Sequence, residues 1–139
     1  MRIRGRIISK GIAIGEAIVS KKKFSFLGDV DVDTGVVVAK DSDIYGESIA
    51  GKIFVFPAGR GSTVGTYVLL RMKKRGTAPK AIINVETEPI IAVGAIIADI
   101  PLIDRLEKDP LETIKTGDVV EVNAIEGWVE VHGGDKEKA

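Results

Sequence analysis

Residues 57–65 read PAGRGSTVG and hold the residue types that can bind or activate a small anionic molecule. Arg60 carries a fixed positive charge on a forked donor group that suits a carboxylate or a phosphate. Ser62 adds a hydroxyl group, and the loop glycines let a ligand approach the backbone closely. A helix-like run follows the loop, and the free N–H groups at a helix start attract anions. The stretch therefore predicts an anion-binding turn with one hydroxyl at its edge.

This loop differs from the common phosphate-binding and nucleophile motifs. The Walker pattern requires a lysine that the loop lacks, and its glycine spacing does not fit the dinucleotide-binding fingerprint. A nucleophile elbow needs one residue between glycine and serine, whereas Gly61 adjoins Ser62. Two interpretations stay open at this point: a functional site, or a tight turn in which Ser62 only caps the following helix.

A second polar loop, NVETEP at residues 84–89, follows another apolar run. If the strands expected at 52–56 and 80–84 are parallel neighbours, both loops lie beyond the carboxyl ends of the strands, where α/β sheets bind ligands. Glu86 and Glu88 are the weaker candidates there, because exposed loop carboxylates are more often solvated than catalytic.

The elements that would position these loops follow from the apolar pattern between residues 52 and 103. Buried strands are expected at 52–56, 80–84 and 100–103. One helix is expected to contain Val64, Val68 and Met72 at helical spacing and to end before Gly76. A second helix over 88–99 is expected to start from Thr87 as its N-cap and to be buried all round. This alternation predicts a parallel β-α-β-α-β layer.

Both ends of the chain read as β structure. Further strands are expected at 2–9, 11–20 and 35–41, a short helix or turn at 109–118, and a hairpin at 118–131 that packs Trp128 on the core. Asp29, Asp31 and Asp33 alternate with valines, which favours a strand with one wet face over a calcium loop, since the glycine and glutamate of an EF-hand are missing. We expect an α/β fold with an antiparallel part built from both chain ends, forming one domain over residues 1–132 before a polar tail at 133–139.

Composition excludes several function classes. The formal net charge is zero, which argues against nucleic-acid binding, and the basic runs at 20–24 and 71–76 are expected to be a solvated loop and a helix C-terminus. Without cysteine the chain cannot supply a thiolate nucleophile or ligate an iron–sulfur cluster. The lone histidine, His132, stands near the C-terminus, a poor place for a triad or a zinc site, so no metal is expected. The longest apolar stretch is too short to span a bilayer, and no signal peptide is seen, so a cytoplasmic protein without a membrane partner is expected.

Residues 56–69, FPAGRGSTVGTYVL, and 81–104, AIINVETEPIIAVGAIIADIPLID, resemble the small subunit of the aconitase X family. The similarity runs over most of residues 1–132. It implies a swivelling β/β/α domain and a hydro-lyase, or dehydratase, that is active only with a large subunit. In that family the serine of the G-R-G-S segment is the proton acceptor, which implies a catalytic Ser62. We take Arg60, Gly61 and Thr63 as its substrate-binding neighbours.

The resemblance also implies a partner and a cofactor. A large subunit, in a heterodimer or higher assembly, would carry the iron–sulfur cluster, and this chain would bind none. The substrate would be a small carboxylate or phosphate compound. Glutamine is absent and asparagine occurs only twice, a heat-adapted bias that favours the archaeal branch and 5-phosphomevalonate in isoprenoid synthesis. Three alternatives remain: a hydroxyproline dehydratase subunit, a non-catalytic docking module, or a swivelling carrier of a phosphorylated histidine.

Overall fold

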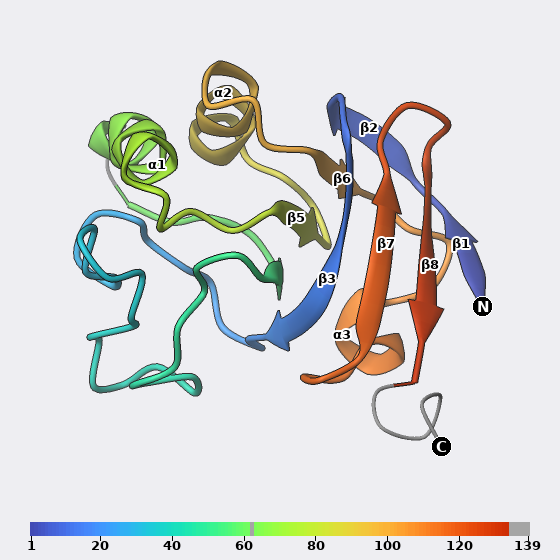
Figure 1. The fold of residues 1–139 in the computed structure, drawn as a ribbon, viewed down its shortest axis with the longest axis horizontal. Helices are drawn as coiled ribbons and strands as arrows, with labels where there is room; N and C mark the ends of the chain where they lie inside the picture. Colours follow the sequence, from blue (N-terminus) through green and yellow to red (C-terminus); the bar gives the residue numbers. More distant parts are fainter. Residues whose placement is uncertain (62, 134–139) are drawn as a thin grey trace.

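A computed structural model describes residues 1–61 and 63–133, and its ribbon is shown in Figure 1. Ser62 and residues 134–139 lie outside the described residues, and with them all of the expected polar tail except Gly133. The strands are β1 (Arg2–Arg4), β2 (Arg6–Ser9), β3 (Ile12–Val19), β4 (Ile53–Phe56), β5 (Ala81–Asn84), β6 (Leu102–Asp104), β7 (Val119–Asn123) and β8 (Trp128–His132). The helices are α1 (Val64–Arg75), α2 (Pro89–Ile97) and α3 (Pro110–Thr113).

Within the described residues, the strands form one sheet in the order β1-β8-β7-β3-β4-β5-β6-β2. The neighbours from β3 to β6 pair in parallel, while β1, β7 and β8 add antiparallel strands and β2 runs antiparallel to β6. Only Gly5 separates β1 from β2, so the two ends of this order are joined and the sheet closes on itself. The expected α/β fold, with an antiparallel part from both chain ends around a parallel layer, is confirmed.

Strands β4 and β5 are buried on both faces, which is why they read as continuous apolar runs. Ile53 and Val55 point into the closed sheet, whereas Phe54 and Phe56 point to the opposite side. There they meet α1, α2 and the segment 24–49, which Figure 1 shows on the side of the sheet away from β7 and β8. Phe24 and Phe26 of that segment pack against Phe54 and Phe56, mostly edge to face, with ring centroids 4.9 to 6.4 Å apart. The sheet therefore separates two cores.

Helix α1 forms where its apolar spacing predicts it. Gly76 adopts the left-handed conformation, and its N–H donates to the carbonyl oxygens of Met72 and Lys73, which ends the helix. The predicted inward face is wrong in part, because Val64 is half exposed. Gly65 and Leu69 take the inward positions instead, alongside Val68 and Met72.

Helix α2 differs from the prediction at its start and along its outer face. Its N-cap is Glu88 rather than Thr87. Val93, Ile96 and Ile97 are each more than 40% exposed, so the expectation of burial all round is wrong. The physical reason is that the sheet and α1 cover one side of this helix, and no described element lies on the other.

Among the described residues, no helix has both the length and the apolar character to cross a bilayer.

The segment between β3 and β4 forms turns rather than the strand expected at 35–41. Its ladder contacts are isolated bridges that join Val30 to Val37 and Val36 to Ser48. Asp31 Oδ1 accepts a hydrogen bond from Asp33 N at 2.9 Å, a local side-chain turn that competes with extended pairing. The expectation of a strand with one wet face at 29–33 is therefore wrong, and the described residues hold no cluster of metal-ligating side chains.

The expected C-terminal hairpin is present as β7 and β8, and Trp128 is buried with 8% of its surface exposed, although it lies outside the two large apolar clusters. The guanidinium of Arg2 lies 3.7 Å from the centre of its ring, a cation–π contact. The indole Nε1 donates to Glu126 Oε1 at 2.9 Å. An arginine on the neighbouring strand β1 thus covers one face of the ring.

Gly5→Ala tests the joint that closes the sheet. A Cβ at Gly5 would lie 2.5 Å from Leu106 Cδ2 and 2.8 Å from Asp104 O, so the chain would have to shift. We expect the free energy of unfolding to fall by about 1–3 kcal/mol, as measured by urea unfolding. Gly15→Ala in β3 is the matched control, because its Cβ would meet only ordinary contacts at 3.4 Å or more. Equal stability of the two variants would contradict a closed joint at Gly5.

Candidate functional site

The two polar loops meet at one edge of the sheet, as their positions after parallel strands predict. Strands β4 and β5 pair in parallel, so both loops leave the sheet at its carboxyl end. The backbone N–H groups of Val85 and Glu86 both donate to Pro57 O, at 3.0 and 3.2 Å. The next strand continues this edge, where Arg105 N donates to Val85 O at 3.1 Å. Backbone hydrogen bonds therefore hold the loops after β4, β5 and β6 against one another.

Two glycines of the loop are required for different reasons. A Cβ at Gly59 would collide with Glu88 Oε1 and Ile91 Cγ1, so its lack of a side chain lets the first loop press against the start of α2. Gly61 has a positive φ of 98°, which only glycine adopts readily, and a Cβ there would lie 3.1 Å from Ser25 Oγ. At both positions neighbouring atoms leave no room for a larger side chain, so the loop is held in one conformation before any ligand binds.

The N-terminus of α2 already holds an anion from its own chain. Glu88 Oε2 accepts a hydrogen bond from Ile90 N at 2.9 Å, and Oε1 accepts one from Ile91 N at 2.7 Å. This carboxylate occupies the positive end of the helix, where a substrate anion would otherwise bind. Of the two helix starts suggested by the sequence, α1 remains the candidate.

The start of α1 is described on both sides of Ser62 but not at Ser62 itself, so the predicted catalytic residue lies outside the described residues. Thr63 is exposed and makes no side-chain capping bond with the part of the chain that the structure describes. Its carbonyl oxygen accepts a hydrogen bond from Thr66 N at 3.2 Å. Gly61 and Thr63, the residues on either side of Ser62 in the sequence, are both exposed.

Arg60 is half exposed and is held from one side. Its Nη2 lies 3.1 Å from Asp29 Oδ1 and 3.0 Å from Asp29 Oδ2. Asp29 Oδ2 also accepts a hydrogen bond from Ser25 N at 2.8 Å, which fixes the carboxylate. This partner was not predicted, because Asp29 stands 31 positions away in the chain. The pair orients the guanidinium of Arg60 at the exposed turn.

The basic run before Phe24 is an exposed loop, as predicted, and it also lies at this site. Phe24 N donates to Ala58 O and Arg60 N donates to Phe24 O, each at 3.1 Å, so a parallel bridge joins Phe24 to Gly59. Lys22 and Lys23 therefore line a hollow with Arg60. Sequence periodicity gives no signal for this pairing, because a single bridge has no repeat.

Comparison with known proteins identifies the family of the chain. Residues 2–131 match the family model described as the aconitase X swivel domain. The chain belongs to the aconitase X swivel domain family. A crystal structure of Thermococcus kodakaraensis aconitase X superimposes on this swivel domain with a TM-score of 0.89 at 53% sequence identity, covering 94% of this chain and 98% of that one.

Two curated relatives are similar over nearly their whole length. The phosphomevalonate dehydratase small subunit of Methanosarcina acetivorans is 56% identical over 131 residues, which cover 94% of this chain and 91% of the relative. The protein of the same name from Archaeoglobus fulgidus is also 56% identical over 131 residues, covering 94% of this chain and 98% of that relative.

A charge network lies beside the glycine loop of this swivel domain. Asp104 is fully buried and accepts hydrogen bonds from Arg6 Nε at 2.9 Å and from Thr87 N at 2.7 Å. Burial acts to raise the pKa of Asp104, but the hydrogen bonds from Arg6 and Thr87 outweigh it and hold that pKa below its ordinary value. Glu86 pairs with Arg105 through bonds of 2.9 and 2.8 Å, which lower the pKa of Glu86. Glu86 is therefore an ion-pair partner and a poor proton acceptor.

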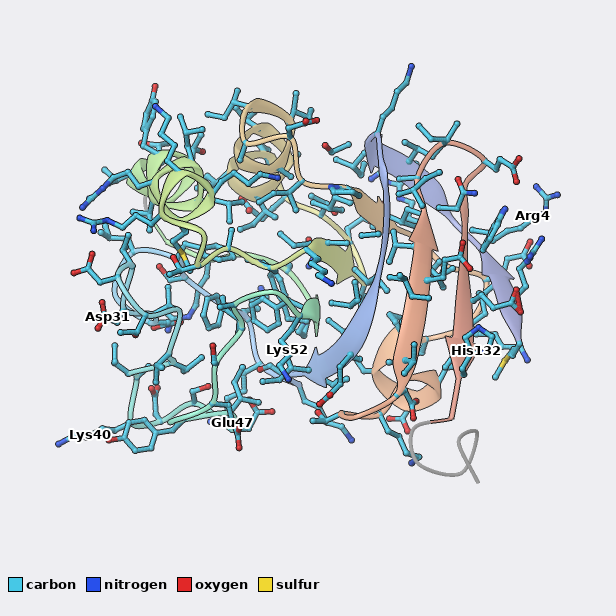
Figure 2. All side chains as sticks on the ribbon, viewed as in Figure 1. Arg4, Asp31, Lys40, Glu47, Lys52 and His132 are labelled. Atoms are coloured by element: carbon cyan, nitrogen blue, oxygen red, sulfur yellow. The ribbon has the colours of Figure 1, made fainter. Side chains whose placement is uncertain are left out.

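The swivel domain itself offers no place for an iron–sulfur cluster. The full sequence has no cysteine, and the described residues contain no group of three or more metal-ligating side chains. His132 ends β8, and Figure 2 shows it across the molecule from α1 and the glycine loop. This separation excludes His132 from the site described above.

Asp104→Asn tests the electrostatics of this network. A depressed pKa stabilises the fold above the unfolded-state value of about 3.9, and that contribution is lost as the pH falls through the lower folded-state value. The variant should be less stable than the wild type at pH 7, and its stability should fall less steeply between about pH 5 and pH 2. Urea unfolding at several pH values measures both effects.

The control is Asp41→Asn, an exposed aspartate whose carboxylate makes no hydrogen bond with a described residue. It should keep the wild-type pH profile. If Asp104→Asn also keeps that profile, Asp104 does not contribute to acid stability.

Proposed function

We propose that this chain is the small subunit of a cytoplasmic archaeal phosphomevalonate dehydratase. With a large subunit, this hydro-lyase would remove water from (R)-5-phosphomevalonate to give trans-anhydromevalonate 5-phosphate in isoprenoid synthesis. The observation that carries the proposal is the match to small subunits of that name, which spans over 90% of both chains. The anion-binding turn at the carboxyl edge of the parallel strands supports it.

The reaction requires a base next to the carbon that loses its proton. In our proposal Ser62 accepts the proton from the carbon bonded to the substrate carboxylate, and hydroxide leaves the neighbouring carbon. A serine alkoxide is costly in water, so donors must stabilise it. The N–H groups at the start of α1 and the guanidinium of Arg60 are the donors in the described residues nearest to it in the chain.

The environment of the other candidates supports this choice. Glu88 is committed to the N-terminus of α2, and Glu86 to Arg105. Neither carboxylate is free to act as the base without giving up these bonds. Arg60, in contrast, is braced by Asp29 through Nη2, while half of its side chain stays exposed toward an incoming substrate.

The large subunit supplies what this chain lacks. An iron–sulfur cluster held by that subunit would act as a Lewis acid on the departing hydroxyl group. The small subunit would bind substrate, orient it against Ser62 and help to exclude water. Because the site would form between two chains, the isolated small subunit should fold and be inactive.

Ser62→Ala tests the base. In the reconstituted two-chain enzyme we expect kcat with 5-phosphomevalonate to fall by about 10²- to 10⁴-fold, the usual contribution of a positioned proton acceptor. Size-exclusion chromatography should show an unchanged complex. The control is Ser48→Ala, which changes a serine at an isolated bridge in the segment 24–49 and should keep full activity. Wild-type kcat in Ser62→Ala would remove the hydroxyl from the mechanism.

Arg60→Lys tests whether a forked donor is needed. A lysine keeps the charge but cannot contact Asp29 and substrate with a planar group at the same time. We expect kcat/KM for 5-phosphomevalonate to fall by about 10- to 100-fold, the cost of losing a charged hydrogen bond. Arg71→Lys on the exposed face of α1 should leave the kinetics unchanged, and unchanged kinetics in Arg60→Lys would assign Arg60 a surface role.

A further inference from the structure

A pocket of about 270 Å³ opens beside the glycine loop, and of its lining residues only Arg60 has a role in the proton transfer proposed above. It lies between the basic run at 20–24 and the turn at 39–42. Its lining residues are Lys22, Lys23, Asp29, Ala39, Asp41, Ser42 and Arg60. Three cations and two carboxylates thus line one small hollow, which leaves it with one excess positive charge in a chain of zero net charge.

The charges around this pocket are not all neutralised from within. Lys22 Nζ donates a hydrogen bond to Asp41 O at 2.6 Å. The Asp29 carboxylate accepts hydrogen bonds from Nη2 of Arg60 but from no other nitrogen of that guanidinium. Among the described residues, Lys23 Nζ has no hydrogen-bond or ion-pair partner, and Arg60 Nε and Nη1 have none. The pocket therefore presents an ammonium group and the free edge of a guanidinium, with the Asp41 carboxylate as its one charged side chain of opposite sign that has no hydrogen-bond partner among the described residues.

The backbone that carries these two cations is fixed. Lys23 precedes Phe24, which is 2% exposed and stacks against Phe54 with ring centroids 4.9 Å apart. The bridge from Phe24 to Gly59 places Lys23 beside the loop that carries Arg60. When two charged side chains stand on a fixed backbone, less conformational entropy is lost on ligand binding than when they stand on a mobile loop.

We propose that this pocket, lined by Lys23 and Arg60, binds the phosphate group of the substrate. The inference rests on the proposed function and names the part of the substrate that the pocket takes. A phosphate monoester carries a charge of about −1.5 to −2, which two unshared cations complement. The substrate carboxylate is bonded directly to the carbon that loses its proton, so it must lie at Ser62 itself. The phosphate is several bonds further along the substrate and suits a pocket set to one side.

Lys23→Gln in the reconstituted two-chain enzyme tests the proposal. We expect KM for 5-phosphomevalonate to rise by about 10- to 100-fold with kcat nearly unchanged, the result of losing one charged hydrogen bond equally in the ground and transition states. Lys23→Arg should recover most of the affinity. Lys74→Gln, an exposed lysine near the end of α1, is the matched control and should keep the wild-type KM.

Competitive inhibitors that carry only a phosphate or only a carboxylate show which end of the substrate the pocket binds. Ethyl phosphate should inhibit Lys23→Gln at least tenfold more weakly than the wild type, whereas butyrate should inhibit both equally. If the variant loses inhibition by butyrate instead, the pocket binds the carboxylate and the proposal is wrong. A wild-type KM in Lys23→Gln, or a loss of kcat alone, overturns it as well.

A second variant keeps the test decisive if Lys23→Gln does not fold. Ala39→Glu places a carboxylate in the wall opposite the loop and should raise KM for 5-phosphomevalonate in the same way; an unchanged KM contradicts the proposal. Failure of the proposed function is distinguishable from these outcomes. In that case the wild-type enzyme itself would not turn over 5-phosphomevalonate.

Discussion

The burial of β4 and β5 on both faces is the constraint on which the rest of the fold depends. Strands that are apolar on both sides need two separate layers to cover them, and the chain supplies both. The closed sheet covers one face, and α1, α2 and the segment 24–49 cover the other. The crossovers to these helices must leave at the carboxyl ends of the strands. The polar loops are therefore gathered at one edge as a consequence of hydrophobic burial.

The crowding at that edge decides which polar groups remain available to a ligand. Gly59 lets the first loop lie directly against Glu88, and Glu88 in turn fills the positive end of α2. Asp104 and Arg6 neutralise each other further along the edge. What is left toward solvent is the start of α1 and the guanidinium of Arg60. Because the other charged groups at this edge are paired within the chain, only one small region of it can bind a ligand.

The aconitase X swivel domain family supplies the setting in which this region would work. A chain without cysteine can contribute donors, a hydroxyl group and a shaped surface, but no thiolate ligand for a metal cluster. The proposed division of labour between two subunits follows from that chemistry. In the proposed function, the part of this chain would be to hold an anionic substrate in place, a role for which cations near the glycine loop matter more than metal ligands.

The sequence alone determined the parallel layer, the end of α1 at Gly76 and the position of the candidate loop, because apolar periodicity and glycine conformation are local properties. It placed the N-cap of α2 at Thr87, but in the tertiary structure Thr87 bonds to Asn84 and to the distant Asp104, and Glu88 takes the cap. It correctly predicted a solvated loop around Lys23 but not the position of that loop beside the site. Only the tertiary structure brought Lys23 to Arg60, since that neighbourhood depends on one bridge between residues 35 positions apart, and a single long-range contact leaves no pattern in the sequence.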